Sequence, residues 1–415
     1  MLDIKYIREH PQEIQKAAAS KGVTLEIKKI IEADENYRKL QLETQRLREE
    51  RNKAAKDRDI EKGKAIKADL EKKEAELRDH EEKLKILLLN IPNPAKPDVK
   101  VGKDESENDV VRKYKTPTKF SFSPKDHLTL GLNLDIIDVD RAAKVSGTRF
   151  AYLKNEAVLL EFALVQFALQ TLIKEGFTPI VPPVLIKKEI TQGLGYWQAG
   201  GSEDYFQIHE PEGQGFYLVG TAEHSIVPMH QNETFNAKDL PKRYIGFSTA
   251  FRREAGSYGK DTKGILRVHQ FDKIEMVSLV EKGKDDEEHE FLLSLEEKLF
   301  KALEIPYQVI KMCTGDLGFP AARKYDLEAW MPGQNKYREV TSVSTVTDFQ
   351  ARRLNIKYRK DNATEFVNIL NGTAFAIGRT IIAILENYQQ EDGSVVIPEV
   401  LRKYVGKNII KPHKA

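Results

Sequence analysis

The segment from about Glu26 to Leu89 limits most strongly what this chain can fold into. It is almost free of glycine and is dominated by Lys, Glu, Arg and Leu, a composition typical of long, solvent-exposed helices. Two runs within it alternate spacings of three and four residues, which is the pattern of a heptad seam. The first seam comprises Tyr37, Leu40, Thr44, Leu47, Arg51 and Ala54, and the second comprises Ile66, Leu70, Lys73, Leu77, His80, Leu84, Leu87 and Ile91.

The stretch between the two seams, KDRDIEKGK, continues neither pattern and contains Gly63. We therefore expect two helices, together spanning about 27–91, that fold back on each other as an antiparallel coiled-coil arm. At 1.5 Å per residue, helices of roughly 30 residues would make this arm about 45 Å long. The pattern alone leaves open whether the arm binds a partner or is a solvated helical pair used for dimerisation or spacing.

Composition excludes several classes of protein. The 415 residues exceed a typical single domain, and 40% of them are hydrophobic, which is enough for a sizeable core. The formal net charge of +2 does not by itself demand a polyanionic partner. The single cysteine, Cys313, excludes an internal disulfide framework and a thiolate zinc cluster, which fits a reducing, cytoplasmic compartment. The N-terminus lacks the apolar run of a signal peptide, and no uninterrupted apolar stretch is long enough to span a bilayer, so we expect a soluble protein without membrane contact.

The proline-punctuated stretch NIPNPAKPDV marks the expected exit from the arm. We expect an N-terminal domain over residues 1–100, a linker over 101–115 and a second domain over 116–415. In the second domain, AVLLEFALVQFALQTLIKEG has helical spacing, and FTPIVPPVLI follows as a strand whose Pro182 and Pro183 suit an edge or a strand end. The expected apolar face of that helix consists of Val158, Phe162, Val165, Leu169 and Leu172, widened by Leu159, Ala163 and Phe167. Strands far apart in sequence with irregularly interspersed helices favour an α+β domain around an antiparallel sheet.

The most informative stretch of the second domain is FRREAGSYGKDTKGILRVHQFDKIEM, residues 251–276, in which two strand-like runs flank a loop. Alternate residues of a strand share a face, so Arg252 and Glu254 point away from Phe251 and Arg253. The return run places on one face Arg267, His269, Phe271, Lys273 and Glu275. Guanidinium groups bind phosphate oxygens, an aromatic ring can stack on a purine, and a carboxylate can bind an amine or hydroxyl. The hairpin thus predicts a site for a nucleotide beside a small amino compound, while cross-strand ion pairs on a solvent-facing strand would explain any single charge.

These motifs give the chain a resemblance to the seryl-tRNA synthetases, a family of class II aminoacyl-tRNA synthetases, along essentially its whole length. The hairpin resembles motif 2 (about 244–277), LNGTAFAIGRTIIAILENYQ resembles motif 3 (about 366–390), and GFTPIVPPVL resembles the dimer-forming motif 1 (about 159–186) with its proline at Pro183. The segments GTAE, KYDLEAWMPGQNKYREV, DFQARRLNIKY and KVSGTRF match further family segments in the same order. The resemblance implies a class II antiparallel sheet flanked by helices, a homodimer, and an N-terminal arm that binds tRNA.

The resemblance further implies the activation of L-serine by ATP to seryl-adenylate and transfer of the seryl group to tRNA(Ser), and it leaves open whether tRNA(Sec) is also charged. Among the matching catalytic positions, Arg252 would clamp the α-phosphate and the serine carboxylate, while Arg267 and Arg379 would hold the distal phosphates. Phe271 would stack on adenine, with Glu254 near its amino edge. The other positions that match ATP contacts are Arg253, Val268, Glu339, Val340, Thr341 and Ser342.

Glu339 and Ser342 also match positions that hold Mg²⁺ in the family. They are an odd number of residues apart, so a bulge or a strand end is required for them to share a face. Nearby, the chain has Val343, Thr345 and Val346 where many relatives carry cysteine or asparagine. With one cysteine and no clustered histidines, the zinc-dependent form of the enzyme is not expected.

The positions that match the family's serine site are Thr221, Ala222, Glu223, Arg252, Glu275 and Thr373. Of these, Glu275 and Thr373 would meet the side-chain hydroxyl. A site built to hydrogen-bond a hydroxyl rejects alanine strongly, because its polar groups would otherwise stay unpaired, whereas threonine must be excluded by the bulk of its methyl group. Thr221 would also make a good helix N-cap, which alone would explain it, and the two roles could coexist.

The loop GSYGKDTKG lacks the spacing of a P-loop or a GxGxxG turn, so we expect a connector that offers Lys260 and Lys263 to the tRNA acceptor end. On the arm, basic side chains could meet phosphates of the long extra arm of serine tRNA, reading its shape rather than its bases. The candidates are Arg46, Lys53, Lys56, Lys64 and Lys67.

Two alternatives remain beside the family's own reaction. One is a class II ligase with another acceptor, such as a carrier protein, but those relatives lack a long N-terminal coiled-coil arm. The other is a catalytically inactive, RNA-binding paralogue, which we would expect to have lost Arg252, Glu275 or Arg379. All three are present.

Overall fold

The computed structural model describes residues 1–197, 201–210, 215–255 and 263–412. The chain divides into two compact units, Met1–Pro94 and Ala95–Ala415, and each is described by itself. The division falls at Pro94 rather than at residue 100. Residues 101–115, expected to be a linker, include β1 (Asp109–Tyr114), which is an edge strand of the main sheet of the second unit.

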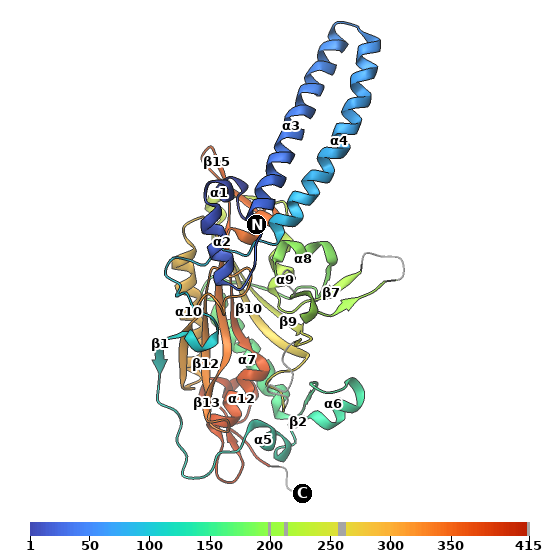
Figure 1. The fold of residues 1–415 in the computed structure, drawn as a ribbon. Helices are drawn as coiled ribbons and strands as arrows, with labels where there is room; N and C mark the ends of the chain where they lie inside the picture. Colours follow the sequence, from blue (N-terminus) through green and yellow to red (C-terminus); the bar gives the residue numbers. More distant parts are fainter. Residues whose placement is uncertain (198–200, 211–214, 256–262, 413–415) are drawn as a thin grey trace. The chain divides into compact units, whose positions relative to one another are not determined.

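The first unit consists of helices α1 (Ile4–Glu9), α2 (Pro11–Ser20), α3 (Ile27–Lys56) and α4 (Ile60–Leu89). The two long helices α3 and α4 lie side by side and form the predicted arm (Figure 1). The seam residues that are buried in this unit are Thr44, Ala54, Ile66, Leu70, Leu84 and Ile91. Charged pairs also join the two helices, with Arg48 2.9 Å from Glu74 and the seam residue Lys73 3.0 Å from Glu43. The heptad prediction is thus confirmed, although Arg51, assigned to the seam, is exposed.

The turn at the tip of the arm is shorter than predicted and does not use Gly63. It comprises Asp57, Arg58 and Asp59, and Gly63 lies inside α4. The carboxylate of Asp59 caps the helix by accepting a hydrogen bond from the backbone N–H of Lys62 at 3.0 Å. Because this cap already satisfies one of the free N–H groups of the first turn, α4 begins before the glycine.

An eight-stranded sheet forms the centre of the second unit, in the order β1-β11-β12-β13-β16-β10-β9-β4. All neighbouring strands are antiparallel except β4 and β9, which are parallel. The predicted α+β class built on an antiparallel sheet is therefore confirmed, with one parallel edge strand. Besides β1, the strands are β4 (Thr178–Ile180), β9 (Lys242–Phe251), β10 (Gln270–Val280), β11 (Tyr307–Lys311), β12 (Arg323–Met331), β13 (Lys336–Thr347) and β16 (Asn368–Ala376).

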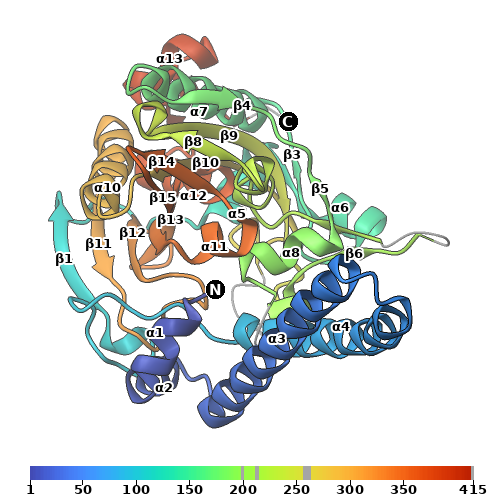
Figure 2. The same ribbon diagram turned by 90° about the horizontal axis from the view of Figure 1, so that it is seen from above.

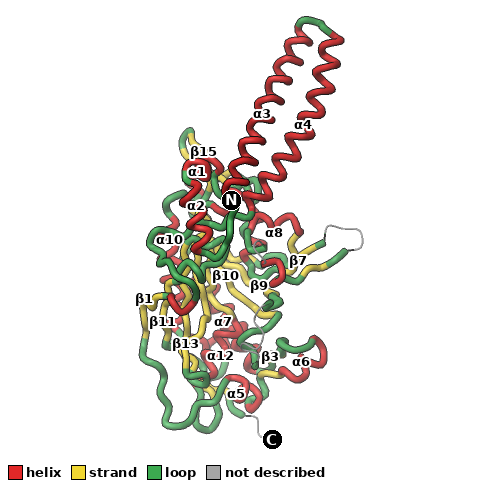
Figure 3. Tube along the Cα trace, viewed as in Figure 1, coloured by secondary structure: helices red, strands yellow, loops and turns green. Residues whose placement is uncertain are grey.

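Helices cover both faces of this sheet (Figure 3). Consecutive residues of β10 belong to different hydrophobic clusters, Met276 to one and Val277 to the other, so the two clusters lie on opposite faces. The larger cluster includes residues of α7 (Glu156–Ile173), α10 (Asp285–Ala302) and α12 (Ile377–Tyr388), and we call this side of the sheet the back face. The smaller cluster includes residues of α8 (Lys188–Leu194), α9 (Glu223–Ile226) and α11 (Phe349–Leu354) on the front face.

Short elements complete the second unit. Its remaining helices are α5 (His127–Asn133), α6 (Val139–Ser146) and α13 (Glu399–Val405). Its 3₁₀ turns are η1 (Glu105–Glu107), η2 (Gly201–Asp204), η3 (Pro228–His230) and η4 (Ala237–Asp239). Its smaller strands are β2 (Ile137–Asp138), β3 (Tyr152–Leu153), β5 (Leu185–Lys187), β6 (Gln207–Ile208), β7 (Phe216–Leu218), β8 (Thr234–Asn236), β14 (Lys357–Lys360), β15 (Ala363–Phe366), β17 (Val395–Val396) and β18 (Ile409–Ile410).

Helix α7 lies beside β4 and β9 (Figure 2), and its buried face is rotated from the predicted one. Ala157, Leu160, Leu164 and Ala168 are fully buried, whereas Phe162 is 55% exposed. The expected face was therefore partly wrong, because the helix is apolar on nearly all sides and its spacing does not select one of them. By length and composition alone α7 could also cross a membrane, but half of it is buried inside the protein, as in an ordinary core helix.

The segment FTPIVPPVLI forms two short strands rather than one. Pro182 and Pro183 lie between β4, at the edge of the main sheet, and β5, which pairs with β7 in a separate small sheet. The expected place of the prolines at a strand end is confirmed. Proline lacks the N–H that a continuous strand would need at this point.

Candidate active site

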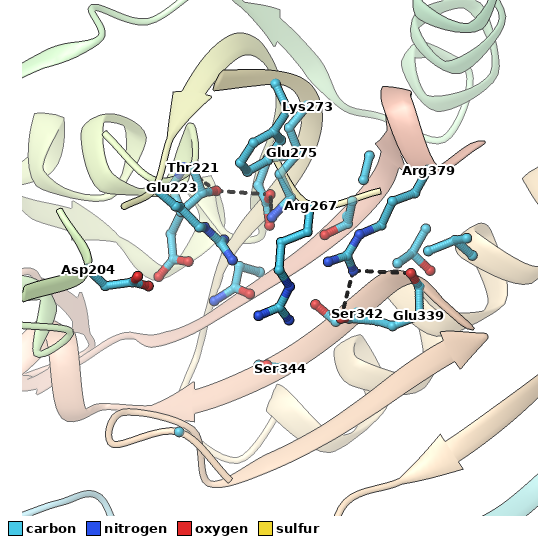
Figure 4. Close-up of a pocket in the computed structure, with 18 of the residues that line it drawn as sticks. Asp204, Thr221, Glu223, Arg267, Lys273, Glu275, Glu339, Ser342, Ser344 and Arg379 are labelled. Carbon is cyan, nitrogen blue, oxygen red and sulfur yellow. Dashed lines mark hydrogen bonds and ion pairs between the residues drawn. The ribbon is translucent and has the colours of Figure 1, made fainter. Parts of the chain in front are cut away.

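A cavity of about 260 Å³ opens on the front face of the main sheet. It brings together residues from β10, β12, β13 and β16 with the ends of β9 and α12 (Figure 4). The predicted site residues that line it are Thr221, Glu223, Arg252, Glu254, Arg267, Val268, Phe271, Glu275, Glu339, Val340, Thr341, Ser342, Thr373 and Arg379. Two candidates do not line it: Ala222 is buried in the front-face cluster, and the side chain of Arg253 is exposed.

The residues expected around serine lie on adjacent strands. Glu275 of β10 is the direct cross-strand partner of Thr373 of β16, and both are buried. Thr221 donates a hydrogen bond to Glu275 Oε2 at 2.9 Å, and Lys273 forms an ion pair with the same oxygen. The Thr221 hydroxyl also accepts a hydrogen bond from the N–H of Glu223, in the first turn of α9, at 3.3 Å. The Thr221 hydroxyl thus contacts both Glu275 and the first residue of α9, but the N-cap of this helix is Ala222, so the predicted N-cap position of Thr221 is wrong.

Arginine side chains form a second group in the cavity. Arg252 follows the last residue of β9, and its guanidinium lies 5.5 Å from the centre of the Phe271 ring. Arg379 donates a hydrogen bond to Glu339 Oε2 at 2.8 Å, and Arg267 lies 3.1 Å from Glu254 Oε2. Three cations and an aromatic ring therefore converge in one cavity, which is a set of groups suited to a phosphorylated purine.

The bulge required to bring Glu339 and Ser342 together is present. In the pairing of β12 with β13, Leu327 lies opposite Thr341 and Glu328 lies opposite Glu339, so Val340 is an extra residue. Glu339 and Ser342 both line the cavity as a result. The bulge changes the alternation of β13 at this point, as expected for an inserted residue.

Glu223 is the most strongly perturbed carboxyl at the amino-acid end of the cavity. It accepts hydrogen bonds from the Tyr196 hydroxyl, 3.0 Å from each carboxylate oxygen, and from Gln350 Nε2 at 2.8 Å. Burial raises the pKa of Glu223 to about 7, although the hydrogen bond from Gln350 opposes this shift. A carboxyl that titrates near neutral pH in a cavity is a common mark of a functional group.

His269 does not take part in the cavity, in contrast to the strand parity. It precedes β10, its Nδ1 lies 3.0 Å from the Arg252 carbonyl oxygen, and its ring packs against Phe150. The alternation fails because the regular strand begins only at Gln270. This histidine is a hydrogen-bonded structural residue.

The comparisons with known proteins agree over the whole length. The model of the seryl-tRNA synthetase N-terminal domain matches residues 1–95, and that of the tRNA synthetase class II core domain (G, H, P, S and T) matches residues 206–388. A serine–tRNA ligase from Dictyoglomus thermophilum is 45% identical over 100% of both chains. The chain belongs to the seryl-tRNA synthetases. Among solved structures, the seryl-tRNA synthetase from Pyrococcus horikoshii complexed with ATP has a TM-score of 0.92 at 41% identity, covering 100% of both chains. The cytoplasmic serine–tRNA ligase from Naegleria fowleri in complex with AMP has a TM-score of 0.89 at 32% identity, covering 100% of this chain and 99% of that one.

Several residues line the cavity of this seryl-tRNA synthetase that the sequence did not assign to it. They include Tyr196, Asp204, Tyr205, Lys324, Ser344 and Asn371. Ser344 could have been found by alternation, since it lies two residues from the assigned Ser342. Asp204 lies in a 3₁₀ turn and has no such signal.

The departures from the family pattern all lie outside the cavity lining. Val343 and Val346 are fully buried, and Thr345 donates a hydrogen bond to Asp285 Oδ2 of α10 at 3.1 Å. In the connecting loop, Lys260 lies outside the described residues.

Proposed function

We propose that this chain activates L-serine with ATP and transfers the seryl group to tRNA(Ser). The observation that carries the proposal is the single cavity in which Glu275 and Thr373 face each other near Arg252, Arg267 and Arg379. Glu275 and Thr373 suit the hydroxyl of serine, and the neighbouring arginines with Phe271 suit the phosphates and purine of ATP. These are the two substrates of the first step. Membership of the family supplies the tRNA acceptor.

In the first step the serine carboxylate attacks the α-phosphate, the bond to the β-phosphate breaks, and pyrophosphate leaves. The chain's own residues position the reactants and offset the charge that builds up in the transition state. Arg252 holds the α-phosphate and the carboxylate, Arg267 and Arg379 hold the departing phosphates, and Phe271 stacks on adenine. In the second step a hydroxyl of the terminal tRNA adenosine attacks the seryl carbonyl carbon, and AMP leaves.

Serine is selected because its hydroxyl would satisfy the hydrogen bonding of buried polar side chains in the cavity. Glu275 and Thr373 bind the hydroxyl, and Glu223 with Thr221 faces the amino group. Alanine would leave these buried polar groups unpaired, which costs enough for rejection without a separate editing site. The threonine methyl is excluded by size.

The cavity also fits Mg²⁺. Proteins usually bind this ion through one or two carboxylates together with substrate phosphates. Burial would raise the pKa of Glu339, but neighbouring cations, above all Arg379, outweigh it and hold the value at about 2, so the group stays ionised. Glu339, with Ser342 next to it, would hold the ion, which neutralises phosphate charge when bound. Among the residues that the structure describes, no three His, Cys, Asp or Glu side chains gather as metal ligands, and independence from zinc remains a prediction.

We further propose that the chain works as a homodimer in the cytoplasm. Motif 1 carries apolar side chains that stay exposed in the single chain, namely Leu159, Phe162 and Val181. Such a patch is typical of a subunit interface. The single cysteine, which cannot build a thiolate cluster, supports the compartment, and a second copy would cover the patch.

The most direct test is ATP–pyrophosphate exchange measured with each of the twenty amino acids. We expect exchange with serine. A response to none of them, or to another amino acid, would overturn the proposal. The alternative of a different acceptor is not favoured, because the N-terminal domain of the family is present, and the inactive alternative is not favoured because its expected losses have not occurred.

The arm is assigned to tRNA binding, with no base-specific contact required. Deleting roughly Leu40 to Leu84 should spare serine-dependent exchange and abolish charging of tRNA(Ser), because only the second step needs the tRNA. Normal charging by the shortened protein would make the arm a spacer. The same assay with tRNA(Sec) decides whether that tRNA is a second substrate.

A further inference from the structure

A cluster of buried polar side chains lies on the back face of the sheet, behind β12 and β13. At its centre is His289 of α10, which is 0% exposed. Arg323 Nε donates a hydrogen bond to His289 Nδ1 at 3.1 Å, and His289 Nε2 lies 3.1 Å from the carbonyl oxygen of Val343. None of these three residues lines the cavity.

The partners of His289 fix its tautomer. An arginine side chain can only donate hydrogen bonds, so Nδ1 of His289 must be the acceptor. In the neutral ring the proton then sits on Nε2, which donates it to the Val343 carbonyl. Burial lowers the pKa of His289 to about 4; the hydrogen bond to Val343 opposes this effect, and Arg323 adds to it. The neutral form therefore persists over the working range of pH.

The carbonyl that His289 holds lies in the part of β13 that faces the substrates. Val343 is between Ser342 and Ser344, and both serines line the cavity. On β12, Arg323 is followed by Lys324, which also lines the cavity. One histidine thus joins the back sides of the two strands whose front sides carry cavity residues.

The outer end of the cluster is tied to the segment after Ala95. Arg323 is 3.3 Å from Asp98 and 2.8 Å from Asp286, and Lys96 is 2.6 Å from both Asp285 and Asp286. Arg323 is 7% exposed, and its three guanidinium nitrogens contact His289, Asp98 and Asp286. Because every contact of Arg323 is directional, its side chain has little freedom to shift.

We propose that His289 is a positioning residue for the ATP half of the active site, acting through the Val343 carbonyl on Ser342 and Ser344. The inference rests on the proposed function, since it assigns these serines to the nucleotide side. An apolar side chain would fill the same space between α10 and the sheet. The buried histidine and arginine instead provide a contact with a fixed direction, and a polar group is tolerated there only because each partner is satisfied.

The test compares His289→Phe with His289→Gln in serine-dependent exchange. Phenylalanine keeps a planar ring but removes both hydrogen bonds, and small displacements at an active site are costly. We expect kcat/KM for ATP to fall about ten- to a hundredfold in His289→Phe, with KM for serine close to that of the unaltered protein. Glutamine keeps one donor and one acceptor, so His289→Gln should recover most of the loss.

His230→Phe is the matched control. His230 is also buried and bonded through both ring nitrogens, to Glu233 at 2.8 Å and to Tyr244 at 2.9 Å. Tyr244 lies near the start of β9, remote from Arg252 at its other end, and neither His230 nor Tyr244 lines the cavity. The His230→Phe variant should leave KM for ATP unchanged. Equal losses for ATP and serine, or equal effects of the two Phe variants, would overturn the inference. Absence of exchange in the unaltered protein would instead contradict the proposed function.

A second measurement avoids any variant that fails to fold. In the intact protein with ¹⁵N-labelled histidine, His289 should show a protonated Nε2 and an unprotonated Nδ1, and should stay neutral down to about pH 5.

Asp98→Asn changes the half-exposed outer end of the cluster. It should raise KM for ATP, as His289→Phe does, but by a smaller factor. A ring protonated on Nδ1, or an Asp98→Asn variant that alters only KM for serine, would overturn the inference.

Discussion

The two faces of the eight-stranded sheet both carry charged side chains, but they use them differently. On the front face, Arg379 pairs with Glu339 and Arg267 with Glu254 inside a cavity of about 260 Å³. On the back face, Glu288 accepts hydrogen bonds from Arg243 at 2.7 and 2.6 Å and from Ser278 at 2.7 Å, and none of these three residues lines the cavity.

The difference teaches that residue type alone does not identify a functional charge. A buried charge that has all its partners stabilises the packing of one helix on one sheet, and removing a partner is costly. A charge that lines an open cavity can exchange its protein partner for a substrate. The three predictions below test this contrast, from the largest expected effect on activity to the smallest.

Arg252→Ala should lower serine-dependent pyrophosphate exchange by about a hundred- to a thousandfold, the usual cost of removing one group that stabilises transition-state charge. The side chain lies at the cavity, and its Nε makes a hydrogen bond to the Gly220 carbonyl at 3.2 Å, so the fold should lose little. Exchange kinetics and thermal unfolding together check this. Normal exchange by this variant would show that Arg252 does not act on the substrates. A large loss of stability would show that Arg252, like the back-face charges, stabilises the fold.

The pH dependence of serine use should follow Glu223. With a pKa of about 7, raised mainly by burial, this carboxyl is neutral below that pH and cannot attract the serine ammonium group. We expect kcat/KM for serine to fall about tenfold per pH unit below about pH 7, because this ratio reports the ionisation of the free enzyme. Glu223→Gln should have a lower ratio that is nearly independent of pH. A profile that is unchanged in Glu223→Gln would contradict this role.

Glu296→Gln, on the back face, should leave exchange unchanged and alter only the pH dependence of stability. Glu296 of α10 is fully buried and accepts a hydrogen bond from Thr341 at 2.8 Å. Burial raises its pKa well above the ordinary 4.5, so the folded protein holds it neutral while the unfolded chain ionises. The contribution of Glu296 to the stability of the folded protein is present below about pH 4.5. It is lost as pH rises, by at most about 1.4 kcal/mol per pH unit.

The glutamine variant should therefore gain stability relative to the unaltered protein between about pH 5 and pH 8 in denaturant unfolding. Glu288→Gln is the control: it breaks the contacts with Arg243 and should lower stability at neutral pH. If the stabilities of the unaltered protein and of Glu296→Gln changed with pH in the same way, this would show that Glu296 is ionised in the folded state.

The sequence predicted those parts of the molecule that obey a regular period. Heptad spacing was enough for the arm, and strand alternation placed Phe271 and Glu275 of β10 on one face, as the cavity lining confirms. Arg267 also lines the cavity, although it precedes the regular strand. The need for a bulge between Glu339 and Ser342 also followed from parity. The matching of motifs to family positions added the residues that come from other strands, such as Thr373.

The rest depended on contacts that no local pattern contains. The tip of the arm was misplaced because a cap at Asp59, rather than Gly63, decides where α4 begins. The buried face of α7 was misassigned because an apolar helix offers several equivalent faces. Strand parity put His269 on the same face as Arg267 and Phe271 because alternation was extended to residues before the start of β10, and the cluster around His289 joins segments far apart in sequence.

The central claim is that the front-face charges bind ATP and serine while the back-face charges keep their partners. A crystal structure of the full chain with a non-hydrolysable seryl-adenylate analogue tests it most directly. The account predicts the phosphate on Arg252, adenine on Phe271 and the seryl hydroxyl between Glu275 and Thr373, with the contacts of His289 and Glu288 unchanged. An analogue bound outside this cavity, or one whose hydroxyl points away from Glu275 and Thr373, would contradict it.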